Sequence, residues 1–343
     1  MRDELYASQG RAVYSKGKHI GEPVFGHIQS IKVITQTVKD HKKNKEIIMG
    51  IFKSLGYYLK EMKYKPVGIL HGFVYGQFPR TYLRILDILL KRGSEDFRDH
   101  VAETYHAKVV RLDDASRFIS IDRNIDLSSE MEQILPYKHA TDLILKNPQN
   151  IVAFECPCRG LRENPCQPTD VCLLIGDPFA DMTRLTQPSR SRRITVEEAL
   201  KIMKEEDDRG HVHTAWFKTV TLNRFYAICN CCKCCCTGML SMSELKMPRI
   251  QPSGYRAEID DSCIGCGKCV SYCQFDAIVE DESAMVTNEK TGKKKRRFMV
   301  MADKCFGCCV CENKCKQEAI KIVRDPSKGM PLNIEELAAA KAG

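Results

Sequence analysis

Residues 263–273 read CIGCGKCVSYC and place four cysteines in a C-x2-C-x2-C-x3-C run. The run recurs as CFGCCVCENKC in residues 305–315, where each of the four cysteines stands 42 residues after its counterpart. Ala277 recurs at the same offset as Ala319. Recurrence at one fixed offset indicates an internal duplication, so this part of the chain is expected to fold as two halves related by approximate symmetry.

The spacing of these cysteines is typical of iron–sulfur ligation. In a tight C-x2-C-x2-C turn, three thiolates can reach three corners of an iron–sulfur cube. Gly265, Gly267 and Gly307 permit backbone turns that a Cβ atom would obstruct. Metal ligation is favoured over disulfides, because cysteines this close in sequence do not readily reach the geometry of a disulfide bond.

This segment resembles the bacterial dicluster ferredoxin family over about residues 255–325. In that family the fourth cysteine of each run binds the cluster of the other run. The resemblance implies that one [4Fe–4S] cluster is held by Cys263, Cys266, Cys269 and Cys315. It implies that a second [4Fe–4S] cluster is held by Cys305, Cys308, Cys311 and Cys273.

The segment departs from the family pattern in two places. Proline usually follows the fourth cysteine, whereas Gln274 and Lys316 stand there and restore a backbone N–H beside each cluster. Hydrogen bonds from such N–H groups tune the reduction potential of a cluster. The departure therefore leaves the potentials open, but it does not change the expected ligands. Residues 279–303 separate the repeats and are expected to form a long hairpin. Cys309 has no cysteine counterpart in the first run and is expected to be a small filler.

A second group of cysteines lies upstream, in residues 154–172, FECPCRGLRENPCQPTDVC. Three prolines stiffen this loop, and its thiols offer four soft ligands. Zinc is the alternative occupant, because closed four-cysteine zinc sites are common. Iron–sulfur ligation is favoured, because zinc sites more often use paired C-x2-C units. The expected ligands of this upstream cluster are Cys156, Cys158, Cys166 and Cys172.

The densest group lies in residues 226–238, YAICNCCKCCCTG. Its members are Cys229, Cys231, Cys232, Cys234, Cys235 and Cys236, of which a subset is expected to bind a further cluster. Cys229, Cys232 and Cys235 repeat the C-x2-C-x2-C register. The ten upstream cysteines could supply two cubes with two thiols to spare, or one larger cluster; two cubes are favoured. Ligation shared between the two loops is left open.

Composition places the chain among reduced, globular proteins. It has 343 residues, 19 cysteines and a formal net charge of +9. Its start carries no apolar signal-peptide region, and no run of 18 apolar residues predicts a membrane-spanning helix. Basic runs at residues 190–193 and 293–297 are expected to be mainly solvated faces.

The expected fold class is α+β, with a helical N-terminal part, a small α/β cysteine-rich domain and a ferredoxin-like dicluster module. The expected domains are residues 1–150, mainly helical; 151–240, with a winged-helix-like helix and hairpin; a linker at 241–255; the dicluster module at 256–325; and a tail at 326–343. Periodicity predicts helices at residues 44–63, 80–93 and 135–147, and a strand at 151–155. A capping box at Thr195 and Glu198 predicts another helix, which ends at Gly210.

Residues 136–320 are similar to 4Fe–4S-binding proteins of anaerobic bacteria and archaea. The expected function is electron transfer through two ferredoxin-type [4Fe–4S] clusters and one or two further iron–sulfur clusters to a redox partner protein within an oxidoreductase complex. One alternative is a redox enzyme subunit with a substrate-accessible upstream cluster. Another is a redox-sensing regulator that binds DNA, although nucleic acid is not the expected partner. The expected location is the cytoplasm, with peripheral membrane contact as a secondary expectation.

Overall fold

The structure is a computed structural model that describes residues 42, 44–46, 48–56, 59–60, 66–127, 131, 134–135, 143–287, 292 and 294–337. The chain divides into two compact units, Met1–Met49 and Gly50–Gly343, and all labelled elements belong to the second. Described residues between 44 and 60 are helical, as the periodicity predicts.

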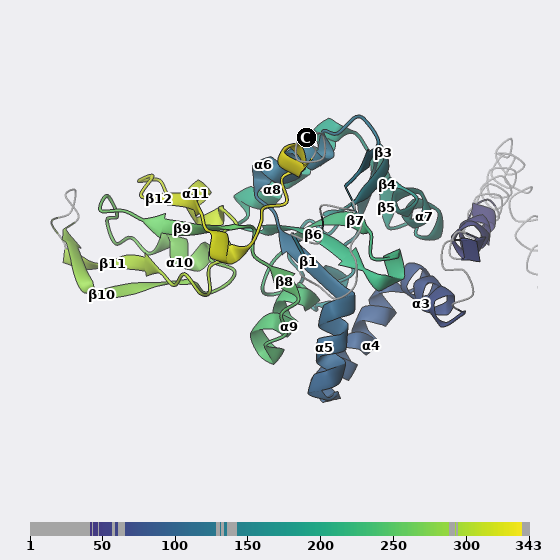
Figure 1. Ribbon diagram of the computed structural model, residues 1–343, viewed down its shortest axis with the longest axis horizontal. Coiled ribbons are helices and arrows are strands. Elements are labelled where there is room, and N and C mark those ends of the chain that lie inside the picture. The colour runs from purple at the N-terminus through teal and green to yellow at the C-terminus, as the bar shows by residue number, and fades with distance from the viewer. Residues whose placement is uncertain are drawn as a thin grey trace, which may run out of the picture. The chain divides into compact units, whose positions relative to one another are not determined.

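The second unit combines helices and strands (Figure 1). The helices are α3 (Pro66–Gln77), α4 (Pro79–Arg92), α5 (Glu95–Thr104), α6 (Leu112–Ile119), α7 (Phe179–Thr186), α8 (Val196–Asp208), α9 (Thr237–Leu245), α10 (Lys268–Tyr272) and α11 (Val310–Lys314). The strands are β1 (Tyr105–Val109), β2 (Ile125–Asp126), β3 (Ile144–Phe154), β4 (Cys172–Asp177), β5 (Ser191–Ile194), β6 (Val212–Lys218), β7 (Phe225–Cys231), β8 (Ile250–Gln251), β9 (Tyr255–Ile259), β10 (Ile278–Thr287), β11 (Lys294–Val300) and β12 (Ile320–Arg324). The fold is therefore α+β, as the sequence predicts.

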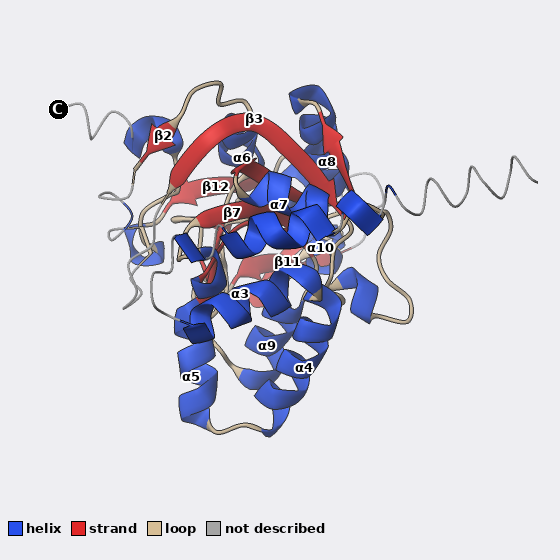
Figure 2. Ribbon diagram, turned by 90° about the vertical axis from the view of Figure 1, so that its right-hand side faces the viewer, coloured by secondary structure: helices blue, strands red, loops and turns tan. Residues whose placement is uncertain are grey.

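An eight-stranded sheet forms the centre of this unit. Its order is β2-β3-β4-β7-β6-β1-β8, and β5 pairs with β3 beside this path. The pairs are antiparallel except for β1 with β8. Figure 2 shows α3, α4, α5 and α9 together on one side of the strands.

The two faces of the sheet bury different hydrophobic clusters, because side chains alternate along each strand. Leu173 of β4 and Phe217 of β6 belong to the cluster that also contains residues of α6 and α8. Leu174 of β4 and Trp216 of β6 belong to the second cluster, together with residues of α4 and α7. Six of the upstream cysteines pack in this second cluster, which we call the thiol-side cluster: Cys156, Cys172, Cys231 and Cys236 are buried there, and Cys158 and Cys229 are among its partly buried neighbours.

The C-terminal cysteine runs form a separate small core. Strand β9 pairs with β12, and β10 pairs with β11 as the predicted long hairpin, although residues 288–291 of its turn lie outside the described residues. Each run contains a five-residue helix, α10 or α11, which ends just before the fourth cysteine. Gly267 begins α10 with a φ of 75°, and Cys309, its counterpart in the repeat, begins α11 with a φ of 69°. The duplication therefore extends to the backbone conformation.

Helix α4 and helix α8 confirm two sequence predictions. The predicted helix at 80–93 corresponds to α4, which is followed by Gly93 as its C-cap. Helix α8 begins after Thr195, whose side chain accepts a hydrogen bond from the backbone N–H of Glu198. Both boundaries therefore depend on the residues that the sequence singles out.

Three expectations differ from the structure. The helix predicted at 135–147 is wrong for residues 144–147, which belong to β3 and pair with β2 and β4. Leu143 and Leu145 are buried there in alternation with the more exposed Ile144 and Lys146, which is the pattern of a strand. Residues 136–142 of the predicted helix lie outside the described residues. The hairpin β6–β7 is not a free wing, since β1 and β4 pair with its outer edges. The boundary at 150 falls within β3, and β1 from the N-terminal part joins the same sheet.

Among the described residues, the helices are all too short or too polar to cross a membrane.

Candidate metal centres

The two C-terminal runs enclose two cavities, and each cavity takes three cysteines from one run and one from the other. Cys263, Cys266, Cys269 and Cys315 line a cavity of about 130 Å³. Cys305, Cys308, Cys311 and Cys273 line a second cavity of about 20 Å³. We call these the outer and inner ferredoxin cavities. The sets agree with those implied by the ferredoxin resemblance, while ligation itself stays a prediction.

The backbone around the inner ferredoxin cavity fits a bound cluster. Gly307 has a φ of 63°, and a Cβ atom there would lie 2.2 Å from the carbonyl oxygen of Tyr255. Backbone N–H groups also point at the thiols: Ala257 donates to Cys305 Sγ and Ala277 donates to Cys273 Sγ, each at 3.3 Å. Thiolates that accept such hydrogen bonds are the usual ligands of [4Fe–4S] clusters.

The ten upstream cysteines separate into a set of four and a set of six. The four are Cys166, Cys232, Cys234 and Cys235, whose sulfur atoms all lie within 4.8 Å of one another. The six are Cys156, Cys158, Cys172, Cys229, Cys231 and Cys236, which line one cavity of about 100 Å³ that the first set also reaches through Cys232 and Cys235. This grouping differs from the expected one, in which Cys166 shares a cluster with Cys156, Cys158 and Cys172.

The sheet explains why the 229–236 segment contributes to both sets. Cys229 and Cys231 lie two positions apart on β7, so their side chains share the face that Cys172 of β4 occupies. Cys172 Sγ and Cys229 Sγ are 3.6 Å apart. After β7 ends, a turn carries three cysteines away to the four-thiol set, and Cys236 returns at the start of α9.

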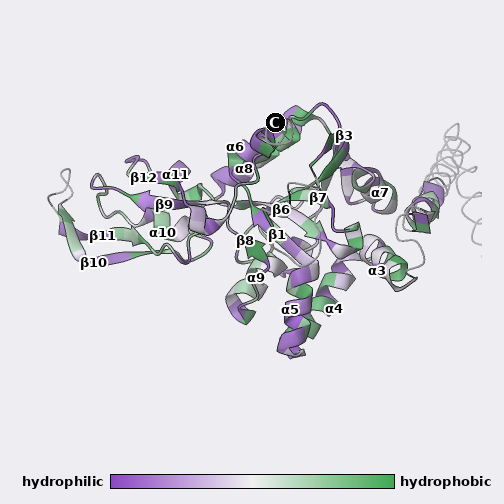
Figure 3. Cartoon of the chain, in the orientation of Figure 1, coloured by the Kyte–Doolittle hydropathy of each residue, from purple (hydrophilic) through white to green (hydrophobic). Residues whose placement is uncertain are grey.

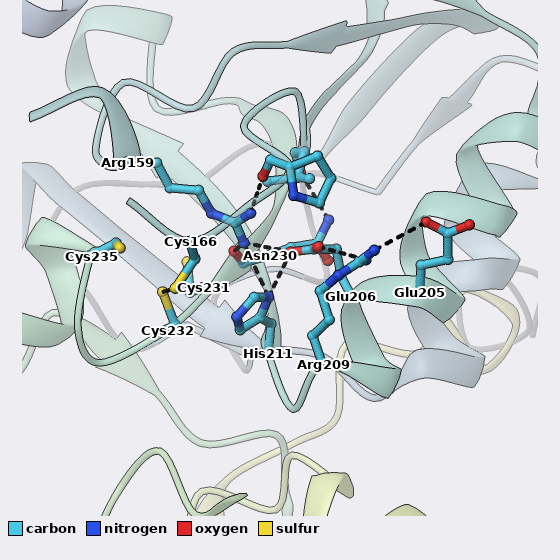
Figure 4. A network of polar contacts seen from close by, with 12 residues as sticks. Arg159, Cys166, Glu205, Glu206, Arg209, His211, Asn230, Cys231, Cys232 and Cys235 are labelled. Carbon is cyan, nitrogen blue, oxygen red and sulfur yellow. Dashed lines mark hydrogen bonds and ion pairs between the residues drawn. The ribbon is translucent and has the colours of Figure 1, made fainter. Parts of the chain in front are cut away.

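A buried ionic network connects the two cysteine loops to α8 (Figure 4). Arg159 is 1% exposed and donates hydrogen bonds to the Glu206 carboxylate and to the carbonyls of Pro168 and Asn230. His211 Nδ1 lies 2.6 Å from Glu206 Oε2. Burial alone would raise the pKa of Glu206, but the contacts with His211 and Arg159 hold it below its usual range. One guanidinium therefore joins the first cysteine loop to β7 and α8.

Lys218 is a second buried cation, located at the edge of the six-thiol cavity. Its ammonium donates to the Tyr75 hydroxyl and lies 4.0 Å from the centre of that ring and 3.9 Å from the centre of the Tyr105 ring. Burial lowers its pKa to about 7, against the opposing influence of Cys229 and Cys158. A buried cation at this position offsets the negative charge of ligating thiolates.

The ferredoxin module contacts the loop that carries the four-thiol set. Gln274, directly after Cys273, accepts a hydrogen bond from the backbone N–H of Lys233 at 2.9 Å and donates to the carbonyl of Gly210 at 2.8 Å. Lys233 Nζ pairs with Asp276 at 2.6 Å. The segment that follows Cys273 is thus held against the turn that carries the four-thiol set.

Other sequence features have structural roles. His211 and His213 are two residues apart and each contacts a protein partner: His211 Nδ1 lies 2.6 Å from Glu206 Oε2, and His213 Nδ1 lies 2.6 Å from Asn230 Oδ1. Cys309 is buried and lies outside the thiol sets described above. In the basic run at 190–193, Arg192 pairs with Asp170 and Glu198. Sequence reasoning missed Arg159 and Lys218, because neither belongs to a motif.

Comparisons with known proteins agree with the C-terminal geometry. Residues 258–279 match the 4Fe-4S binding domain family. The chain is similar to Ferredoxin-3 of Nostoc sp., at 33% identity over 61 residues, which are 16% of this chain and 63% of that protein. It is also similar to the pyruvate synthase subunit PorD of Methanocaldococcus jannaschii, at 32% identity over 66 residues, which are 19% of this chain and 63% of that protein. The chain therefore covers less than two thirds of these relatives, and the likeness supports iron–sulfur electron transfer by a ferredoxin-like module.

Proposed function

We propose that this protein carries single electrons from a redox partner through its ferredoxin module to an iron–sulfur centre held by the six-thiol set. The observation that carries the proposal is the contact between the two. Phe306 and Cys308, which line the inner ferredoxin cavity, pack against the thiol-side cluster that contains Cys156 and Cys231. Residues from both centres thus share one buried hydrophobic region.

The ligands proposed for the two ferredoxin clusters are the cysteines that line the two cavities. The fourth cysteine of each run binds the cluster held by the other run. At least four of the six upstream thiols would hold the third centre. Bound iron–sulfur clusters would supply one-electron reduction and oxidation. The chain's own residues would fix the distances between the clusters and exclude water. Phe275 and Phe306, whose ring centres are 4.1 Å apart, stack on one another and pack against the thiol-side cluster.

The outer ferredoxin cavity is the proposed entry point for electrons. Cys266 is an exposed member of that cavity, which places its thiol within reach of another protein. Lys268 and Lys316 also line the cavity, so an acidic partner surface would be attracted to it. The similarity to a pyruvate synthase subunit supports a partner within an oxidoreductase complex. Free thiols in such number support a reducing compartment, the cytoplasm.

The exchange Gln274→Leu tests the proposed path. The change removes the two hydrogen bonds that Gln274 makes with Lys233 and Gly210, each of which contributes about 1 kcal/mol. Their loss should weaken the contact between the ferredoxin module and the 232–235 turn by a factor of roughly 30. Electron transfer from the ferredoxin clusters to the upstream centre should slow by about tenfold or more under that change, as followed by rapid-freeze EPR after a pulse of reductant.

The repeat supplies the matched control. Lys316 occupies the position equivalent to Gln274 in the second run and is exposed, so Lys316→Leu should leave internal transfer unchanged. EPR signals of the ferredoxin clusters should be the same in both variants. Equal internal rates in the two variants would contradict the path.

A redox enzyme is the second candidate, and the surroundings of Lys218 favour it. Lys218 and Tyr105 line both the six-thiol cavity and a neighbouring cavity of about 450 Å³ formed by α3, α4 and α5. A largely apolar cavity with a few polar groups at one end is typical of small-molecule sites. Cyanide would then shift the EPR spectrum of the upstream centre; a spectrum that cyanide leaves unchanged would exclude this candidate.

A further inference from the structure

The four-thiol set is distinguished by its compactness, since all four of its sulfur atoms lie within 4.8 Å of one another. Cys234 Sγ lies 3.3 Å from Cys166 Sγ, 3.4 Å from Cys232 Sγ and 3.7 Å from Cys235 Sγ. Cys232 Sγ and Cys166 Sγ are 3.8 Å apart. The ferredoxin thiols, in contrast, surround cavities between them.

These separations fit a single metal ion. Tetrahedral zinc has Zn–S bonds of about 2.3 Å, which places its sulfur ligands about 3.8 Å apart. A cube has four irons between its thiolates and must hold them farther apart. The sulfur atoms of the set, all within 4.8 Å of one another, leave room for one ion at their centre.

The chemistry of the set is that of a structural site. All four donors are thiols, and together they complete a four-coordinate shell with no position left for substrate. One ligand comes from the loop after β3, and three come from the turn after β7. Arg162 of the first loop donates to the carbonyl of Cys235 at 3.1 Å, so the two loops also meet outside the thiols.

We propose that Cys166, Cys232, Cys234 and Cys235 bind one zinc ion, which holds the 232–235 turn in the shape that receives the ferredoxin module. Lys233 lies between two of these ligands, and it makes the contacts with Gln274 and Asp276. Zinc has no redox chemistry, so this ion would stabilise the docking surface without taking part in electron transfer. The site is independent of whether the six-thiol set holds iron.

The test is metal analysis of the whole protein purified without oxygen. We expect one zinc per chain. Cobalt exchanged into the site should show the visible ligand-field bands of a tetrahedral thiolate complex. Cys234→Ser, at an exposed position, should lose the zinc and the cobalt spectrum while the ferredoxin EPR signals remain. Amide hydrogen exchange in residues 272–276 should become faster, because the turn that receives them is no longer fixed.

Cys309→Gly is the matched control, because it removes a buried thiol outside the set and restores the residue of the first repeat. It should keep the zinc, the cobalt spectrum and the slow exchange. Protein without zinc, whose Cys234→Ser variant loses iron and sulfide instead, would overturn the proposal. Zinc that remains in Cys234→Ser at the wild-type amount would also overturn it. Neither result depends on electron transfer, so failure here is distinguishable from failure of the proposed function.

Discussion

Replacing Arg159 with leucine should destabilise the protein by about 3–5 kcal/mol, because the change removes the buried arginine that pairs with Glu206. Among the described residues, only Arg209 and His211 then remain beside that carboxylate. Glu206 is fully buried, and Arg159 is nearly so. The carbonyls of Pro168 and Asn230 lose their donor in the same variant. Chemical unfolding followed by circular dichroism measures the free energy of unfolding.

The same variant should lose iron from the upstream centre, because Arg159 joins the loop of Cys156 and Cys158 to the strand of Cys229 and Cys231. Arg192→Leu is the control: Arg192 also pairs with two carboxylates, but its side chain is 47% exposed. Its loss should cost less than about 1 kcal/mol. If the two arginine variants had the same stability and the same iron content, the network would not organise the thiols.

The second large effect is expected from a pair of cysteine variants in one loop. Cys172→Ser should remove the upstream iron signal and leave the single-ion site intact, because Cys172 lies 3.6 Å from Cys229 in the six-thiol set. Cys166→Ser should do the reverse, because Cys166 lies 3.3 Å from Cys234. Iron, sulfide and zinc analysis with EPR of each reduced variant measures both outcomes.

Each variant is the control for the other. The two positions are six residues apart, so a general effect on the loop would change both centres in both variants. Loss of the same iron cluster in both would show that Cys166 and Cys172 are ligands of one centre. That result would restore the grouping that follows from sequence spacing alone.

The C-terminal module could be predicted in detail, because its information is local. The repeated run places three thiols in one turn, and the offset of 42 residues relates the two halves. The positive φ shared by Gly267 and Cys309 shows that the local backbone repeats even where the residue differs. The predicted helices α4 and α8 are equally local, since Pro79, Gly93 and Thr195 mark their ends.

The separation of the upstream cysteines into a four-thiol set and a six-thiol set could not be predicted, because it depends on where β7 ends. Cys229 and Cys232 belong to one C-x2-C register in sequence, yet Cys229 faces the thiol side of the sheet and Cys232 lies in the turn. A single residue of strand length reverses the face on which a side chain lies. The partners of Cys229 come from β4 and from the loop before it, more than 50 residues away.

The N-terminal part was partly predictable for a related reason. Its helices have strong periodicity, whereas β1 is a five-residue strand buried along its whole length between β6 and β8. Such a strand shows no alternation between polar and apolar residues, and Lys108 within it is buried beside carbonyl partners that are distant in the sequence. It donates, for example, to the carbonyl of Pro252.

The most direct test of the account is the anaerobic count of iron and acid-labile sulfide per chain of the wild-type protein. Two ferredoxin clusters account for about eight irons, and a further centre in the six-thiol set brings the expected count to at least about twelve, with a similar amount of sulfide. EPR should then show a reducible signal in addition to those of the ferredoxin clusters. A count of about eight irons, with zinc in both upstream sets, would contradict the central claim that electrons pass from the ferredoxin module to an upstream iron–sulfur centre.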